Sequence, residues 1–520
     1  MFSRKRSENL CFVSSAIPIL LLLLCFQPGC ESSRPVQAGL LQHKTLVIAH
    51  EIPYLSLDPQ LKNDNVTWSV IGNIFEPLVE FDSQMKLVGS LAERWENPND
   101  LTWRFYLRRN VRFHDGKPFN AEDVAYTIRR GLAGTNAGTR PYLISVKDVN
   151  VIDPLTVDII TDRPNPVLLN RLTFIFILPV SAHPEEAIHR PMGTGPYMFE
   201  REDIPGQKLT LRANPAYWGG QPAIEHVQFV SLSPAEKMVE GLLKGSVQLI
   251  RDFPETLIPR IEKSANCTLK THDSLGVSFL GFNLTGNPKT NPFQRLEVRK
   301  AIAAGLDSAR LVAEGMEGRA VSARQLVSPV VFGYNPELIP EPVSLDRARQ
   351  MLKKAGLPQG FHSEVYGVDA PRLIKLAGQL RELGLDVEPH LSQWSDLYEK
   401  LLHHQVPMYA LSWNCSTGDA SDLLDSCLHT PDPNRGYGNF NYAGYGNREV
   451  DHLIELSGQT LKPNERKVYL QKALVLASKD VPYIPLYSRF RHYGVSKDLN
   501  WEPRRDGRLY ASDMSWKQQQ

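Results

Sequence analysis

Segments typical of strands and of helices alternate along almost the whole chain from residue 45, and this alternation predicts an α/β fold. Residues 45–49 are rich in β-forming side chains, and residues 101–107 alternate apolar and polar side chains as a half-buried strand does. Helices are expected after the capping residue Asn120 and over residues 371–383, where Pro371 stands in the first turn. Because 520 residues exceed what one hydrophobic core serves, we expect at least two lobes.

Two apolar segments are less regular. Residues 172–180 are short, apolar and close to Pro179, which predicts a buried strand. Residues 481–487 follow a helix expected over 465–479, and their prolines predict an irregular connection.

Composition excludes several classes of protein. Hydrophobic residues make up 42% and charged residues 22% of the chain, and the net charge is +1, so no large basic surface for nucleic acid is indicated. No segment after residue 30 reaches the ~18 apolar residues of a membrane helix. The chain also lacks a Gly-x-Ser-x-Gly elbow, a His-Glu-x-x-His motif and a phosphate loop, so nothing indicates an enzyme.

The first 30 residues have the pattern of an export signal. A basic segment that includes Arg4 precedes an apolar run over 16–26, which is too short to span a bilayer and ends near Gly29 and Cys30. A cysteine at this place resembles the lipidated residue of bacterial lipoproteins, although Gln27 departs from that pattern. We therefore expect a signal peptide over 1–30, lipidation of Cys30, a tether over 31–43, and a location in the periplasm or cell envelope. Cleavage nearby and an uncleaved anchor are the alternatives.

Three further cysteines, Cys267, Cys415 and Cys427, lie in the rest of the chain. Their spacing fits no zinc site. Any one pair could form a disulfide outside the cytoplasm, and the sequence does not choose among the three pairings or exclude free thiols.

Several short phrases follow one another in a fixed order along the chain. They are 57–59 (LDP) with 74–79 (IFEPLV), 91–96 (LAERWE) with 105–108 (FYLR), 111–116 (VRFHDG) with 121–124 (AEDV), 193–197 (GTGPY), 214–218 (NPAYW), and 282–284 (FNL) with 292–293 (PF) and 298–302 (VRKAI). Together they resemble the bacterial extracellular solute-binding proteins of family 5, which serve peptide and nickel importers.

The resemblance implies a type II periplasmic-binding fold, in which two α/β lobes are joined by a hinge and one lobe carries an extra subdomain. It places the first lobe at 44–70, 195–285 and 486–520, the extra subdomain at 71–194 and the second lobe at 286–485. It implies a monomeric receptor without a cofactor that captures peptides and delivers them to the permease of an ABC transporter. The alternatives are a nickel-chelate or haem receptor of the same fold, and a sensory ligand-binding protein.

The resemblance also suggests site residues. Asp419, in the segment from Trp413 to Asp422, matches the aspartate that holds the ligand ammonium in dipeptide-binding relatives; Ala420 departs from the usual proline. Asp419 would alternatively cap a helix that starts at Ala420, and Asp422 is the second candidate for the ammonium. Arg372 matches the arginine that holds the ligand carboxylate, with a solvated surface arginine as the alternative. Trp413 either stacks on the ligand or fills the core.

Nickel-chelate relatives use an arginine and a histidine in the cleft. His403 and His404 form the one adjacent histidine pair in the chain, and they stand where a helix is expected to end.

Overall fold

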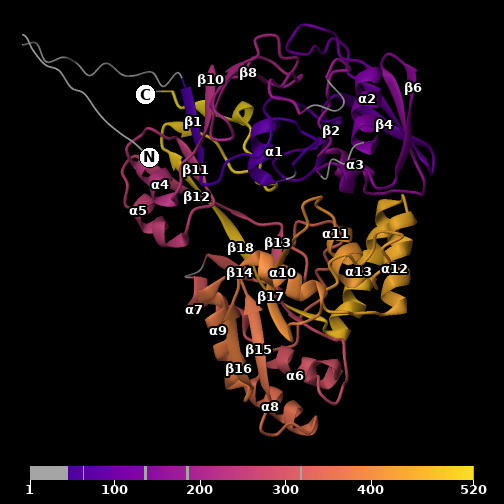
Figure 1. The fold of residues 1–520 in the computed structure, drawn as a ribbon, viewed down its shortest axis with the longest axis vertical. Coiled ribbons are helices and arrows are strands. Elements are labelled where there is room, and N and C mark those ends of the chain that lie inside the picture. The colour runs from indigo at the N-terminus through magenta and orange to yellow at the C-terminus, as the bar shows by residue number, and fades with distance from the viewer. Residues whose placement is uncertain (1–44, 63, 134–137, 183–186, 317–318, 519–520) are drawn as a thin grey trace, which may run out of the picture. The chain divides into compact units, whose positions relative to one another are not determined.

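One long strand, β18 (Tyr483–Ser496), belongs to both major sheets of the protein. The computed structural model describes residues 45–62, 64–133, 138–182, 187–316 and 319–518. The first part of β18 pairs with β13 (Gly276–Phe282), and its last part pairs with β11 (Leu249–Arg251) and β12 (Cys267–Asp273), all antiparallel. Figure 1 shows β18 running from one sheet into the other. The chain therefore crosses between the two sheets along this strand.

The first sheet is built around β1 (Thr45–His50), which pairs in parallel with β10 (His226–Ser231) and with β11. β9 (Lys208–Ala213) and β8 (Tyr197–Ile204) extend it as antiparallel strands. Leu46 and Ile48 of β1 are fully buried because they lie in the core that this sheet forms with α1 (Asn65–Ile71) and the C-terminal residues. α4 (Ala235–Leu243) and α5 (Ile258–Glu262) contribute to a second core cluster with Ala49 and Ile250. The short strands β19 (Leu499–Asn500) and β20 (Ser515–Trp516) pair near the C-terminus.

A separate antiparallel sheet, in the order β4-β5-β7-β6, lies within residues 92–161 and has its own core. Its strands are β4 (Ala92–Asn99), β5 (Thr102–Leu107), β6 (Val146–Asp153) and β7 (Thr156–Thr161). The same part of the chain contains the small strand pair β2 (Val79–Phe81) and β3 (Leu87–Gly89) and the helices α2 (Ala121–Ala133) and α3 (Leu168–Leu172). The predicted start of α2 is confirmed: Asn120 Oδ1 accepts from the Glu122 N–H at 2.8 Å, and the Asn120 N–H donates to Asp123 at 2.9 Å.

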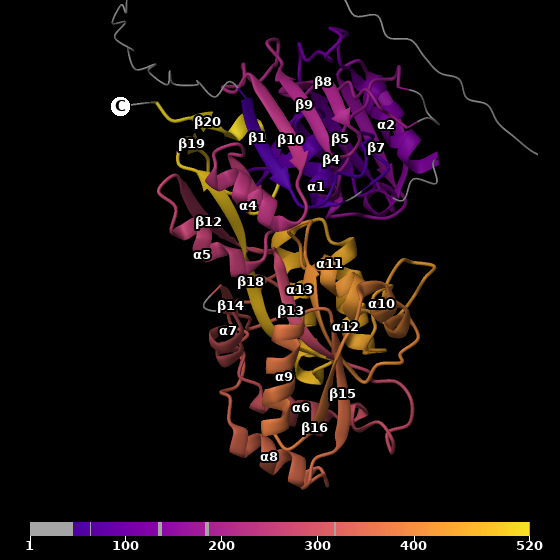
Figure 2. The ribbon, with the colours of Figure 1, turned by 60° about the vertical axis from the view of Figure 1, so that its left-hand side comes forward.

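The second sheet has the order β16-β15-β17-β13-β18, with the short strand β14 (Ala320–Ser322) paired to β18. Consecutive residues point to opposite faces of this sheet, so that Val365 and Met408 lie in one core cluster and Tyr366 and Tyr409 lie in another. The strands are β15 (His362–Gly367), β16 (Asp386–Leu391) and β17 (Met408–Asn414). Four helices pack on the face that carries Val365 and Met408: α6 (Leu296–Gly305), α7 (Ser308–Met316), α8 (Leu345–Lys354) and α9 (Ala370–Glu382). Four others pack on the face that carries Tyr366 and Tyr409: α10 (Trp394–Leu402), α11 (Ser421–Leu423), α12 (Arg448–Gln459) and α13 (Pro463–Asp480). Figure 2 shows these helices from another side.

Two expectations about apolar segments are wrong. Residues 483–487 are not an irregular connection, because they form the first part of β18. The strand continues through Pro485 at a shift of register opposite Ser278 and Phe279, where the missing proline N–H is tolerated. Residues 172–180 are largely buried, but they form no strand beyond a single bridge between Phe176 and Pro77.

The expected lobe boundaries differ from the strand pairing at β13 and at residues 487–489, which pair with β14 in the second sheet although the first lobe was expected to resume at residue 486. β13 pairs with β17 in the second sheet, whereas a first lobe that extends to residue 285 would include it. The signal peptide, the tether and Cys30 lie outside the described residues. Within those residues, no helix is both long and apolar enough to cross a membrane. Cys267, Cys415 and Cys427 are buried free thiols.

Candidate functional site

A cavity of about 430 Å³ lies where β15 ends and β17 continues without it. β15 pairs with β17 only as far as Gly367 opposite Ala410. From Leu411 to Asn414, β17 has a partner strand on one side, β13, and none on the other among the described residues. The open side is a free strand edge beside the cavity, and an extended chain can add to such an edge through main-chain hydrogen bonds.

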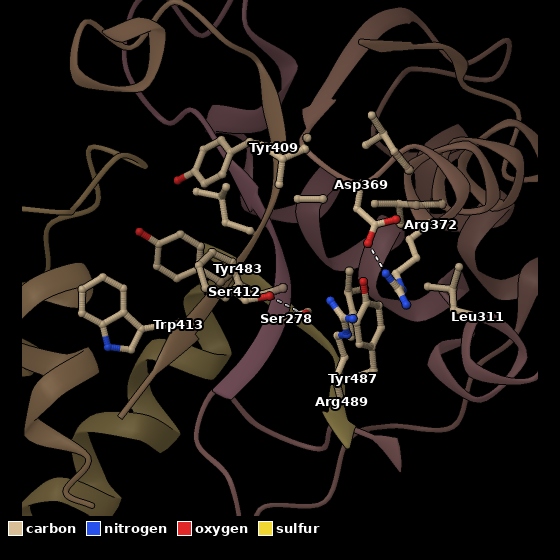
Figure 3. A pocket seen from close by; sticks show the side chains of 18 of the residues that line it. Ser278, Leu311, Asp369, Arg372, Tyr409, Ser412, Trp413, Tyr483, Tyr487 and Arg489 are labelled. Atoms are coloured by element: carbon tan, nitrogen blue, oxygen red, sulfur yellow. Dashed lines mark hydrogen bonds and ion pairs between the residues drawn. The ribbon is translucent and has the colours of Figure 1, made fainter. Parts of the chain in front are cut away.

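Aromatic side chains line one part of this cavity. Figure 3 shows Tyr409, Tyr483 and Trp413 on one side of the strands, and the ring of half-buried Trp413 contacts Phe440 at 5.3 Å between centroids. Trp413 Nε1 and the hydroxyl of Tyr442, which also line the cavity, are covered and hydrogen bond to no described residue. A buried polar group without a partner costs about 1–3 kcal/mol, so these groups favour a ligand that has polar atoms.

Charged side chains line the other part. Arg372, in the first turn of α9, donates from Nη2 to both carboxylate oxygens of Glu255 at 2.8 Å and from Nη1 to Asp369. Nη2 of Arg489 also lies 3.3 Å from Glu255. Glu255 follows β11 of the first sheet, whereas Arg372 belongs to α9, which packs on the second sheet. This ion pair therefore joins the parts of the protein that are built on the two sheets. With Lys375 in the lining, three cations meet two carboxylates here, and the excess charge is positive.

A second cavity, of about 510 Å³, shares Trp413 and Phe440 with the first. Residues 141–171 line it from the side of the antiparallel sheet, and residues 413–466 line it from the second sheet. Asn170 Nδ2 donates to the carbonyl of Thr417 at 2.7 Å, which holds the two sides together. Asp422 and Asp425 lie in its lining together with Arg163, Arg171, Arg435 and Arg466, so its wall carries charges of both signs.

Burial changes the protonation of these two carboxylates. It raises the pKa of Asp422 to about 7, against hydrogen bonds from Thr417, and the neighbouring charge of Asp419 adds to the rise. Burial also raises the pKa of Asp425 to about 6, although Arg171, whose guanidinium lies 4.0 Å away, opposes the shift. Asp425 belongs to a single turn of π-helix, Leu424–Leu428, that follows α11. A ligand cation between these carboxylates would favour their ionised forms.

Asp419 has a different environment from the one expected. Its two carboxylate oxygens accept from Arg466 at 2.6 and 2.7 Å, and Oδ1 also accepts from the Ser421 N–H at 2.9 Å. Burial raises its pKa, but Arg466 outweighs burial and holds the pKa below its usual range. The side chain is almost fully buried and lines neither cavity. Asp419 bonds the first residue of α11, but the helix starts at Ser421 with Ala420 at its cap position, one residue later than the capping alternative expected. Arg466 takes the place of an ammonium partner.

The structure thus brings Arg372 and Trp413 to the first cavity and Trp413 and Asp422 to the second, whereas Asp419 lines neither and is paired with Arg466. The sequence reasoning missed Asp425 and Glu255. Asp425 stands three residues after Asp422, a spacing that places two side chains on one face of a helix. No local signal connects Glu255 with Arg372, because 117 residues separate them.

The histidine pair has no place in either cavity. His403 is exposed at the end of α10, and His404 Nδ1 contacts the carbonyl of Tyr442 at 3.0 Å. Among the described residues, no histidine lines the two cavities.

Comparison with known proteins gives consistent results. The family model for bacterial extracellular solute-binding proteins, family 5, matches residues 86–435. Heme-binding protein A of Haemophilus influenzae is 26% identical over 91% of this chain and 92% of that protein, and the glutathione-binding protein GsiB of Salmonella choleraesuis is 27% identical over 85% and 88%. The periplasmic binding protein DppA of Helicobacter pylori, solved with the peptide STSA, superposes with a TM-score of 0.73 at 22% identity, over 91% of this chain and 98% of that one.

The family match covers more than half of the chain, and the similarity to the solved structure confirms the predicted type II periplasmic-binding fold. The members of this family are binding proteins rather than enzymes. The chain belongs to the bacterial extracellular solute-binding proteins of family 5.

Proposed function

We propose that this protein captures short peptides outside the cytoplasm and delivers them to the permease of an ABC importer. The observation that carries the proposal is the free edge of β17 from Leu411 to Asn414, beside a cavity that presents aromatic and charged side chains. Main-chain pairing to such an edge holds a peptide whatever its sequence, and an adjoining cavity takes one of its side chains.

Particular charged side chains of the two cavities are candidates for holding the two ends of a peptide. The excess positive charge near Arg372 and Arg489 suits the terminal carboxylate, and a guanidinium can hold a carboxylate through two hydrogen bonds. We propose that Asp422, assisted by Asp425, pairs with the ammonium of the peptide, because the carboxylate of Asp419 already forms an ion pair with Arg466. Trp413 lies in the lining of both cavities, so a ligand that extends from one to the other would contact it.

The relatives support a peptide over the other ligands. One of those described above is named for glutathione, which is itself a peptide, and one was solved with a peptide; a third is named for haem. Imidazole is a common ligand of haem iron and of nickel, and among the described residues no histidine lines either cavity, although the first cavity has Met316 and Cys427 in its lining. We also propose that Cys30 is lipidated, which would hold the receptor at the membrane surface near its permease.

A thermal-shift comparison tests the choice of ligand. Because a ligand that binds only the folded state raises the melting temperature, a mixture of di- to pentapeptides is expected to raise it, whereas haem and nickel–histidine are expected to leave it unchanged. A rise with haem or nickel–histidine alone would contradict the proposal. Restored peptide uptake, when the gene is returned to a strain that lacks it, would favour import over a sensory role.

A further inference from the structure

Two carboxylates and an imidazole lie together on the outer strands of the second sheet, outside the lining of both cavities. β15 and β16 run in parallel, with Glu364 opposite Glu388 and Tyr366 opposite His390. Residues two apart on a strand point to the same face, so these four side chains share one face of the sheet. Because paired strands are rigid, their register fixes the backbone positions from which these four side chains extend.

The possible ligand atoms are close to one another. Nε2 of His390 lies 3.1 Å from Oε1 of Glu364 and 3.8 Å from Oε1 of Glu388, and the ligand atoms of all three residues lie within 4.8 Å of one another. Around a zinc ion with bonds of ~2.0–2.2 Å, tetrahedral ligand atoms lie about 3.4 Å apart. Small rotations of the two glutamate side chains would bring the three atoms to that spacing.

The electrostatic arrangement favours a cation. Like charges directly opposite each other in a strand pair repel, and Glu364 faces Glu388 in this way. Within the described parts of the chain, neither glutamate forms an ion pair with a lysine or arginine. Nε2 of His390 is covered and makes no hydrogen bond to a described residue, despite its proximity to both carboxylates. A bound cation would offset the repulsion between the two glutamates and would take the place of a proton on this nitrogen, which already lies 3.1 Å from Glu364 Oε1.

Neighbouring groups orient two of the three ligands. The ring of His390 stacks on Tyr366, with 4.7 Å between centroids and 15° between planes. The Tyr366 hydroxyl donates to Oε2 of Glu364 at 3.1 Å, which leaves Oε1 toward His390. Lys400 Nζ lies 5.0 Å from the centroid of the Tyr366 ring and so adds to the packing around it. Such supporting contacts fix the rings and carboxylates of metal sites.

We propose that Glu364, Glu388 and His390 bind a divalent transition-metal ion of the zinc type, with water completing the coordination. One imidazole and two carboxylates suit zinc and its neighbours rather than calcium, which prefers oxygen ligands alone. Three protein ligands on an exposed edge leave an open position, so the ion would exchange with the medium.

Calorimetric titration with zinc chloride alone tests the proposal, on protein purified without a polyhistidine tag and treated with a chelator. We expect one zinc ion per chain, and His390→Ala and Glu388→Gln should each weaken binding at least about tenfold, as loss of even a supporting group does. Glu388→Gln is nearly isosteric, so it carries the test if His390→Ala folds poorly. No zinc binding by the wild type, or equal binding by Glu388→Gln, would overturn the proposal.

His226 of β10 provides a matched control. It also lies beside two carboxylates, with Nδ1 3.1 Å from Glu200 and Nε2 3.6 Å from Glu225, and its side chain is 32% exposed, as is that of His390. Its two carboxylates approach different ring nitrogens, so the three groups cannot hold one ion. His226→Ala should leave zinc binding unchanged; loss of the zinc site in this variant would refute the assignment.

Discussion

Asp422 should make peptide binding depend on pH between 5 and 7. Burial raises the pKa of this carboxyl to about 7 in the protein without ligand, and only the ionised form pairs with the peptide ammonium. About half of the Asp422 side chains are ionised at pH 7 and about 1% at pH 5. Because apparent affinity is proportional to the competent fraction, binding should weaken roughly 50-fold between these values, or about 2.3 kcal/mol.

Binding to the ionised form also releases protons. At pH 7, where about half of the Asp422 side chains carry a proton, peptide binding should release about half a proton per chain. Calorimetry at pH 5, 6 and 7, in buffers with different ionisation enthalpies, measures both the affinity and this release. The ligand is the peptide recovered from the purified protein.

Two variants show whether Asp422 is the source of the pH dependence. Asp422→Asn keeps the shape and removes the charge, so it should bind weakly at pH 7 and lose most of the decrease toward pH 5. Asp396→Asn, at an exposed position on α10, should behave as the wild type does. Equal wild-type affinity at pH 5 and 7, or the same pH dependence in Asp422→Asn, would refute the assignment.

Three further changes should have measurable effects. Arg466→Met leaves the buried carboxylate of Asp419 unpaired and should lower the free energy of unfolding, measured in urea, by about 3–5 kcal/mol. Adding Asp419→Leu should restore most of this loss. Unaltered stability of Arg466→Met would contradict the ion pair. Glu255→Gln should free Arg372 and tighten calorimetric binding of peptides with a free carboxylate several-fold, but not of amidated ones; an equal effect on both would reject this competition. Cys30→Ser should abolish palmitate labelling and move the protein from the membrane fraction to the soluble one, and continued labelling would exclude Cys30 as the lipidated residue.

Elements with local signals were predicted well. The helix expected over 371–383 is α9, and its end precedes Gly384, whose φ of +96° suits glycine. β18 was missed because its regularity depends on pairing with distant strands, which place Pro485 at a shift of register. The sequence shows the proline but not the partner strand.

The site was predicted less completely than the fold, for the same reason. The resemblance led to Arg372 and Trp413, and both line the first cavity. The partner of Asp419 is Arg466, 47 residues further along, and it arrives on another helix, so no spacing in the sequence indicates the ion pair. The free edge of β17 exists because β15 ends at Gly367, which only the pairing of the two strands reveals.

Capture of a peptide at the edge of β17 is tested most directly by mass spectrometry of the ligand released when the purified protein is denatured. Peptides of a few residues, with both ends free and intact after prolonged incubation with the protein, are the predicted result. Release of haem, a metal chelate or a sugar, or peptides cut during the incubation, would contradict it.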